Sequence, residues 1–89
     1  MPSVHFAPIF QRHLPVQSLE PQGRDLSECL YALFQTYPSL KHYLLDDQNR
    51  IRQHVAVFIN NQALKSRTNW NIPLNDNDQI YIMQALSGG

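Results

Sequence analysis

The sequence has few of the residues that mark secreted, membrane or nucleic-acid-binding proteins. Its single cysteine cannot form an internal disulfide, so we expect a protein of a reducing compartment, the cytoplasm. Lysine and arginine number 7, as do aspartate and glutamate, which leaves no basic excess for binding a phosphate backbone. The longest uninterrupted apolar run, residues 55–59, is far shorter than the roughly 20 residues that span a bilayer. We therefore expect neither a nucleic-acid partner nor a membrane partner.

Metal ligands and catalytic groups are also scarce. Cys29 falls on the apolar stripe of a predicted helix, where a cysteine acts as a small hydrophobe rather than a nucleophile. The acidic pairs 46–47 and 76–78 lie in turn-forming sequences, in which aspartate bonds its own backbone. The four histidines show no ligand spacing: His5, His13, His42 and His54. We expect no metal site, no bound cofactor and no enzymatic activity of the chain alone.

The sequence does contain enough hydrophobic residues to form the core of one small domain. Of its 89 residues, 43% are hydrophobic and 16% are charged. A chain of this length forms one domain, because domains usually have roughly 100 to 200 residues. The fold must then consist of two layers of secondary structure packed against one another.

Hydrophobic periodicity predicts the elements of the first half. Residues 3–7 and 16–20 alternate like short strands, the second at a sheet edge. Asp25 is a predicted N-cap, with Glu28 completing a capping box, and Pro38 prevents the helix from continuing. The helix between them presents one apolar stripe, made of Leu26, Cys29, Leu30, Leu33, Phe34 and Tyr37.

The second half reads as a short helix followed by three strands. The helix is expected over residues 39–45, and the strands over 54–59, 62–64 and 79–84. Asn60 and Asn61 suit the positive φ values of a tight hairpin turn, and Asn77 suits a left-handed turn residue. The segment 65–73 is expected to be an ordered loop, anchored by its large apolar side chains.

This order of elements predicts an α+β fold, one mixed sheet with one main helix packed across it. Because alternate strand residues share a face, each strand divides into an inner and an outer set. The inner set, toward the helix, is Val4, Phe6, Val55, Val57, Ile59, Ile80 and Ile82. The outer set is His5, Ala7, Ala56, Phe58, Tyr81 and Met83.

Three segments together resemble the MoaD/ThiS family of ubiquitin-like sulfur carriers. Ile59-Asn60-Asn61 is similar to the Val-Asn-Gly that ends a family strand, and residues 74–80 are similar to its Leu-x-Asp-Gly-Asp-x-Val motif. Ser87-Gly88-Gly89 matches the small residue and two glycines that end the family's chains. Asn61 and Asn77 stand where the family usually has glycine, and asparagine is the substitution most compatible with positive φ.

The resemblance implies a β-grasp (ubiquitin-like) fold over residues 1–84 and a flexible tail over residues 85–89. In this fold the last strand lies between the first and the third. The outer face would then carry an apolar patch of Phe58, Tyr81 and Met83 beside the tail, a candidate site for docking a partner.

The resemblance also implies a chemistry for the tail. A ubiquitin-activating-type adenylyltransferase, using ATP and Mg, would adenylate the carboxylate of Gly89, and a persulfide donor would convert it to a thiocarboxylate. The thiocarboxylate would deliver sulfur to a sulfur-accepting partner enzyme. Glycine suits this end because it can enter a narrow channel with any φ. The remaining tail residues for the partner's channel are Ala85, Leu86, Ser87 and Gly88.

Several functions remain open at this point. Molybdopterin biosynthesis, as the small subunit of the synthase, is the favoured pathway, followed by a carrier in cysteine biosynthesis. The same adenylated tail would also serve a ubiquitin-like modifier conjugated to lysines through Gly89. A third possibility is an interaction module whose tail is inert, because chain ends tolerate almost any sequence.

Overall fold

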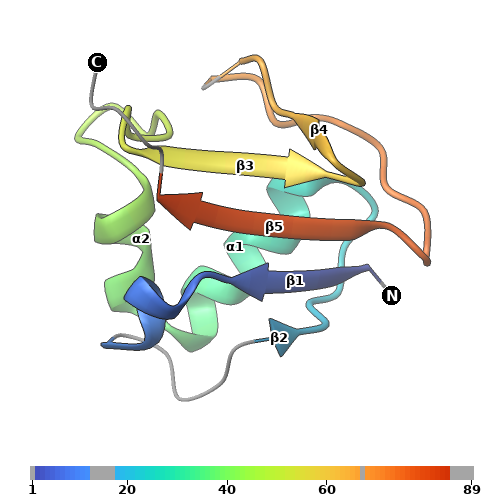
Figure 1. Ribbon diagram of the computed structural model, residues 1–89, viewed down its shortest axis with the longest axis horizontal. Coiled ribbons are helices and arrows are strands. Elements are labelled where there is room, and N and C mark those ends of the chain that lie inside the picture. Colours follow the sequence, from blue (N-terminus) through green and yellow to red (C-terminus); the bar gives the residue numbers. More distant parts are fainter. Residues whose placement is uncertain (1, 13–17, 67, 85–89) are drawn as a thin grey trace.

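A computed structural model describes residues 2–12, 18–66 and 68–84 of the chain (Figure 1). The elements in chain order are β1 (Ser3–Phe6), the 3₁₀ helix η1 (Pro8–Arg12), β2 (Ser18–Leu19), α1 (Leu26–Thr36), α2 (Pro38–Leu44), β3 (Val55–Ile59), β4 (Gln62–Ala63) and β5 (Gln79–Gln84). The expected tail, the start of the expected strand 16–20 and His13 lie outside the described residues.

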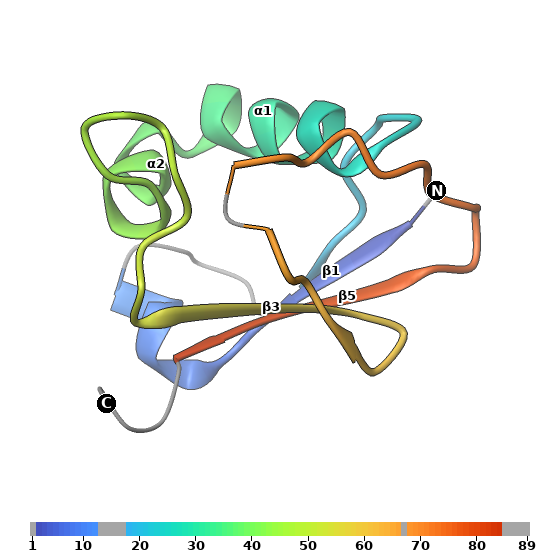
Figure 2. The ribbon, with the colours of Figure 1, turned by 90° about the horizontal axis from the view of Figure 1, so that it is seen from above.

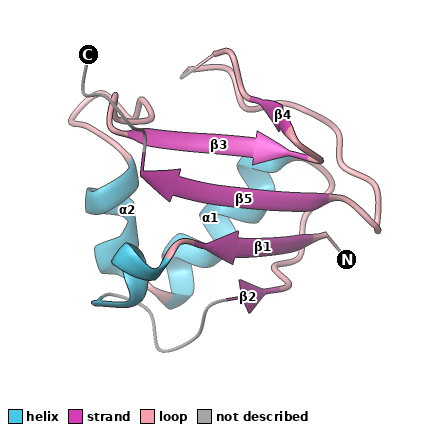
Figure 3. Ribbon diagram, viewed as in Figure 1, coloured by secondary structure: helices cyan, strands magenta, loops and turns pink. Residues whose placement is uncertain are grey.

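The five strands form one mixed sheet in the order β2-β1-β5-β3-β4. The central strand β5 runs parallel to β1 and antiparallel to β3. Both α-helices lie on the same side of the sheet, so the molecule has two layers (Figure 2 and Figure 3). This is the β-grasp arrangement, and the predicted central position of the last strand is confirmed.

Strand periodicity separates the two faces of the sheet as expected, except at Ala7: this residue was predicted on the outer face, but it follows the end of β1 and packs against the core. The side chains of Val4, Ile80 and Ile82 are completely buried on the helix side. Residues between them, such as His5 and Tyr81, are partly or largely exposed on the outer face. The predicted inner set is therefore confirmed, with Ile59 at its less buried end.

Helix α1 starts and ends where its capping residues predict. The side chain of Asp25 accepts a hydrogen bond from the Glu28 N–H, as an N-cap should. The carboxylate of Glu28, however, accepts from the Arg24 N–H rather than from Asp25, so the reciprocal bond lies one residue earlier than in a capping box. Pro38 ends the helix at Thr36 and itself begins α2.

Two local features differ from the sequence predictions. The predicted positive φ of Asn77 is wrong: among the described residues other than glycine, φ is positive at Asn49, Asn60 and Asn61. Asn49 adopts it because the side chain of Asp46 accepts hydrogen bonds from two backbone N–H groups and closes this turn. The segment after β1, for which the sequence predicts no helix, forms η1 and buries Phe10 in the core.

One apolar core lies between the sheet and the helices. It includes Trp70, which is 5% exposed and anchors the loop after β4 as predicted. No polar or charged side chain is buried among the described residues. Within the same residues, no helix has the length and apolar character needed to cross a membrane.

Candidate functional site

The outer face of β3 and β5 brings together the three residues of the predicted patch. Phe58 is paired with Tyr81, and Met83 is paired with Ala56, so the large side chains lie on adjacent strands. Together with Asn61 they line an open hollow of about 360 Å³. We call these four residues the outer patch. Asn61 was not predicted as part of this site, because its place there depends on how the hairpin turn folds back.

Two exposed large apolar side chains of the described residues lie together in this patch. Tyr81 is 39% exposed and Met83 is 42% exposed. Among the described residues only two other large hydrophobic side chains, Ile9 and Tyr31, are comparably exposed, and neither lines the outer patch. Isolated exposed hydrophobic residues are ordinary, whereas adjacent ones on a rigid sheet are typical of docking surfaces.

His5 holds the aromatic ring of Tyr81 on the β1 side of the patch. The two rings stack, with centroids 4.8 Å apart and an interplanar angle of 26°. The His5 ring is itself held by both nitrogens, with Nε2 2.7 Å from Gln79 Oε1 and Nδ1 2.8 Å from Ser18 Oγ. The sequence predicts the face on which His5 lies, but not these hydrogen bonds, which join three strands.

The two turns at one end of β3 and β5 are linked by side-chain hydrogen bonds. Asn60 Nδ2 donates to Asp78 Oδ1 at 2.8 Å, and the Gln79 N–H donates to Asn60 Oδ1 at 2.8 Å. The backbone N–H of Asn75 also donates to Asp78. This bond, with that from Asn60, lowers the pKa of the Asp78 carboxyl. Asp78 therefore has the turn role that its sequence context predicts.

The opposite end of β5 leads to the tail. The strand ends at Gln84, which is paired with Val55 at the start of β3, and Met83 precedes it directly. The predicted tail residues Ala85, Leu86, Ser87, Gly88 and Gly89 lie outside the described residues. The described part thus places the outer patch next to the base of the tail, on the same central strand.

Two other reactive side chains, those of Cys29 and Asp46, have structural roles. Cys29 is fully buried, and burial raises the pKa of its thiol, with the carboxylates of Asp25 and Glu28 adding to the shift. Hydrogen bonding by the Arg50 backbone N–H lowers the pKa of Asp46, which also pairs with Arg50 Nε at 2.9 Å. Among the described residues, no group of three histidine, cysteine or acidic side chains is placed to hold a metal.

The chain matches a known sequence family over most of its length. The model of the ThiS family matches residues 8–89, which include the last strand and both terminal glycines. A sequence search of the curated proteins gave no match.

Solved structures with the same fold cover almost the whole chain. One chain of the BexX/CysO complex from Amycolatopsis orientalis has a TM-score of 0.84 and 19% identity, with 100% of each chain covered. SAMP1 from Haloferax volcanii has a TM-score of 0.77 and 16% identity, covering 99% of this chain and 98% of its own. Urm1 from Sulfolobus solfataricus has a TM-score of 0.69 and 25% identity, covering 94% of this chain and 100% of its own.

Proposed function

The chain belongs to the ThiS family of ubiquitin-like sulfur carriers, and we propose that it carries sulfur as a thiocarboxylate on Gly89. The observation that carries this proposal is the family match, which continues through the Gly-Gly end. The geometry supports it, because the central strand β5 leads directly from the outer patch to the base of the tail. The chain then acts as a co-substrate of partner enzymes, and the catalytic groups belong to those enzymes.

The chemistry starts from an unreactive group. A C-terminal carboxylate, with an ordinary pKa of about 3.5, is ionised and a poor acyl donor. In the proposed first step, an oxygen of the Gly89 carboxylate attacks the α-phosphorus of Mg-ATP on an adenylyltransferase, and pyrophosphate leaves. The terminal sulfur of a persulfide donor then attacks the acyl carbon and AMP leaves. A second donor thiol cleaves the sulfur–sulfur bond, which releases the thiocarboxylate and leaves the donor as a disulfide.

We assign docking of the adenylyltransferase to the outer patch. Its open hollow of about 360 Å³ offers the rings of Phe58 and Tyr81 and the flexible Met83 to an apolar side chain of the partner. The stack of His5 on Tyr81 limits the rotamers of that ring, so less conformational entropy is lost on binding. A partner seated here lies beside Gln84 and is in position to receive the tail.

The acceptor of the sulfur is chosen by the partner enzyme rather than by the fold. We propose to test the acceptor enzyme of molybdopterin synthesis first and an acceptor enzyme of cysteine biosynthesis second. Reconstitution with each candidate acceptor enzyme, starting from the thiocarboxylate form, separates the two.

A second function, protein modification, is favoured by one specific observation. The chain shares its fold with SAMP1 proteins, one of which is described as a small archaeal modifier protein. In this case the adenylated Gly89 would acylate a lysine amine, with AMP as the leaving group. The two functions share the activation step and differ only in the nucleophile.

Intact-protein mass spectrometry with C-terminal fragmentation tests the proposal directly. The chain is purified from its own cells without added thiols or amines. Exchange of one Gly89 oxygen for sulfur is the expected result, and a Gly89–lysine linkage would replace the carrier by the modifier. A carboxylate that stays unmodified with ATP and the cell's activating enzymes would overturn both.

A further inference from the structure

Ile9 is a large exposed apolar side chain that does not belong to the outer patch. It lies on η1 and is 41% exposed. Together with Phe10, Tyr43, His54 and Gln84 it lines a hollow of about 180 Å³, which we call the end hollow. These residues come from four separate places in the chain: η1, α2, the turn before β3 and the end of β5. The end hollow is therefore a product of the tertiary fold.

The inner walls of the end hollow are held by packing and by the sheet. Phe10 is 2% exposed, and its ring meets those of Phe6 and Tyr43 edge to face, with centroids 6.0 Å and 5.9 Å away. The Ala7 N–H donates to Ile82 O at 2.9 Å, which holds the start of η1 against β5. The apolar floor of the hollow thus exists before anything binds in it.

The end hollow lies where the chain leaves β5. Gln84 lines it and is also the last residue of that strand. On one side of β5, strand β1 ends at Phe6, beside Ile82, and is followed by η1; on the other side, β3 begins at Val55, beside Gln84. Figure 1 shows α2, the end of β5 and the blue helix η1 at the same end of the molecule. A chain that continues the direction of β5 therefore starts at the rim of the end hollow.

Strand alternation indicates which side chain is in position to enter this hollow. Ile80 and Ile82 are fully buried on the helix side of β5, and Gln84 and Leu86 are the next two residues of the same alternating set. With consecutive Cα atoms 3.8 Å apart, the Cα of Leu86 is within about 7.6 Å of that of Gln84. Leu86 is also the one large apolar residue in the segment 85–89.

We propose that the side chain of Leu86 occupies the end hollow in the free carrier and leaves it when a partner enzyme takes the tail. Among the described residues that line the hollow there is no lysine, arginine, aspartate or glutamate, so a leucine enters it without desolvating an ammonium, guanidinium or carboxylate group. Its entry also removes the exposed side chain of Ile9 from water, which favours the occupied state.

Occupation of the end hollow would compete with the partner for the tail. This step rests on the proposed function, in which Leu86 enters the partner's channel and cannot lie in the hollow at the same time. Burial of one leucine is largely offset by the conformational entropy lost when Ala85 and Leu86 are ordered. We therefore expect the occupied form to exceed the released form about two- to fivefold, which weakens the apparent affinity of the partner by a similar factor.

The first experiment is NMR on the full chain without any partner. We expect nuclear Overhauser effects between the Leu86 methyl groups and the side chains of Ile9 and Tyr43. Ile9→Ser should remove these contacts and lower the order parameter of the Leu86 N–H. Tyr31→Ser is the control, because Tyr31 is similarly exposed but lies on α1 and does not line the end hollow. Leu86→Ser is the reciprocal variant and should shift the Ile9 methyl resonances, whereas Ser87→Ala should not.

Three results of this experiment would overturn the inference. The Leu86 methyl groups show no contact with the end hollow, or the contacts to Ile9 come from the segment 13–17, or they depend on protein concentration, which would mean that a second copy occupies the hollow. None of these measurements requires an activating enzyme, so they do not depend on the proposed function.

The second experiment measures ATP–pyrophosphate exchange by the cell's adenylyltransferase with the Ile9→Ser and Tyr31→Ser variants. We expect Ile9→Ser to lower KM for the carrier about two- to fivefold with kcat unchanged, because the tail is released more often. Tyr31→Ser should leave both constants unchanged. If the unmodified chain is not adenylated while the Leu86 contacts are present, the proposed function fails and the occupied hollow remains. If adenylation proceeds and Ile9→Ser leaves KM unchanged or raises it, the competition is refuted and the inference fails alone.

Discussion

The two faces of β5 differ sharply in exposure from one residue to the next. Ile80 and Ile82 are 0% exposed against the helices, whereas Tyr81 and Met83 are 39% and 42% exposed on the other face. Successive residues of one strand thus alternate between holding the fold together and offering a surface to a partner. A sheet covered by helices on one face only leaves its other face available for recognition.

Because the two faces differ in this way, we expect different residues to control stability and partner binding. Inner-face substitutions should change unfolding and leave partner binding intact in the molecules that remain folded. Outer-face and tail substitutions should do the reverse. The following expectations test that division, from the largest effect to the smallest.

Deletion of Gly88 and Gly89 should abolish adenylation without changing stability. The described strand pairing ends at Gln84, before both glycines, so we expect the sheet to remain intact. ATP–pyrophosphate exchange with the adenylyltransferase and thermal unfolding measure the two quantities. Substantial exchange by the truncated chain would show that the reactive end is not Gly89.

Ile82→Ala should lower the free energy of unfolding by about 2–5 kcal/mol, because it removes a fully buried side chain and leaves a cavity. Urea denaturation at neutral pH measures the loss. Met83→Ala, one residue away on the outer face, is the matched control and should cost less than about 1 kcal/mol. Equal losses in the two variants would contradict the division of the faces.

Gly23→Ala should destabilise the helix side by about 1–3 kcal/mol. A Cβ at this position would lie 2.7 Å from the backbone N of Cys29 and 2.9 Å from its Sγ, so the chain before α1 would have to move. Urea denaturation again provides the measurement. An unchanged midpoint would show that this contact relaxes at no cost.

Tyr81→Ala should weaken binding of the adenylyltransferase about 5- to 30-fold, the effect of truncating an aromatic residue at the centre of an interface. Titration calorimetry measures this affinity. Tyr31→Ala is the control, since Tyr31 is 46% exposed but lies on α1 on the opposite side of the sheet. Equal losses would place the interface elsewhere.

Asp78→Asn should change the pH dependence of stability rather than partner binding. The pKa of Asp78 is lowered in the folded chain, so its stabilising effect is present above the ordinary aspartate pKa of about 3.9. That effect is lost as the pH falls through the lower pKa of the folded state. Unfolding of the variant should therefore differ most from the unmodified chain near neutral pH and converge with it in acid. Asp47→Asn serves as the control, and a difference that is independent of pH would contradict the assignment.

Periodicity and turn chemistry predicted most of the fold because these signals are local. The limits of α1 follow from Asp25 and Pro38, and the hairpin follows from two asparagines that accept positive φ. Asn77 shows where this reasoning stops. An asparagine tolerates positive φ but does not require it, and at this turn the hydrogen bonds to Asp78 hold the chain in another conformation.

The candidate site, like the fold, was predicted from the sequence only in part. The alternation within residues 55–59 and 79–84 was enough to place Phe58, Tyr81 and Met83 on one face. The sequence did not reveal that Asn61 joins the patch, that His5 fixes Tyr81, or that Phe10 is buried by η1. Each of these depends on contacts between segments far apart in the chain.

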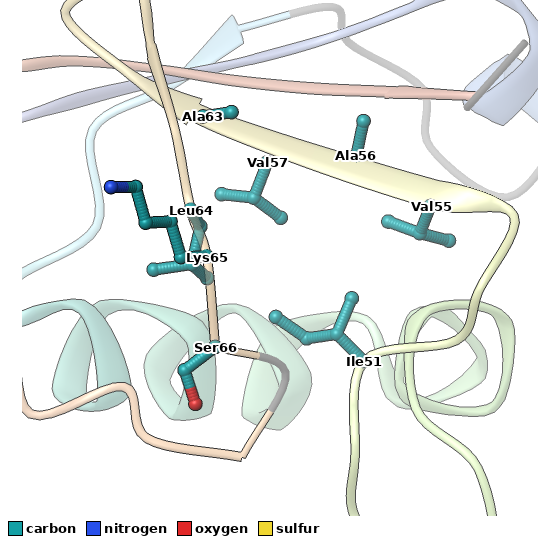
Figure 4. A pocket seen from close by; sticks show the side chains of 8 residues that line it. All are labelled: Ile51, Val55, Ala56, Val57, Ala63, Leu64, Lys65 and Ser66. Carbon is teal, nitrogen blue, oxygen red and sulfur yellow. The ribbon is translucent and has the colours of Figure 1, made fainter.

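By itself the sequence determined the elements, the two faces of the strands and the family to which the chain belongs, because spacing and residue type act over a few neighbouring residues. The tertiary structure alone decided which faces become surfaces and where the chain leaves the sheet. The chain after β4, for example, leaves β3 for the helix layer (Figure 4). No periodicity records that departure, since it is determined by the packing of Leu64 and Trp70 against the common core.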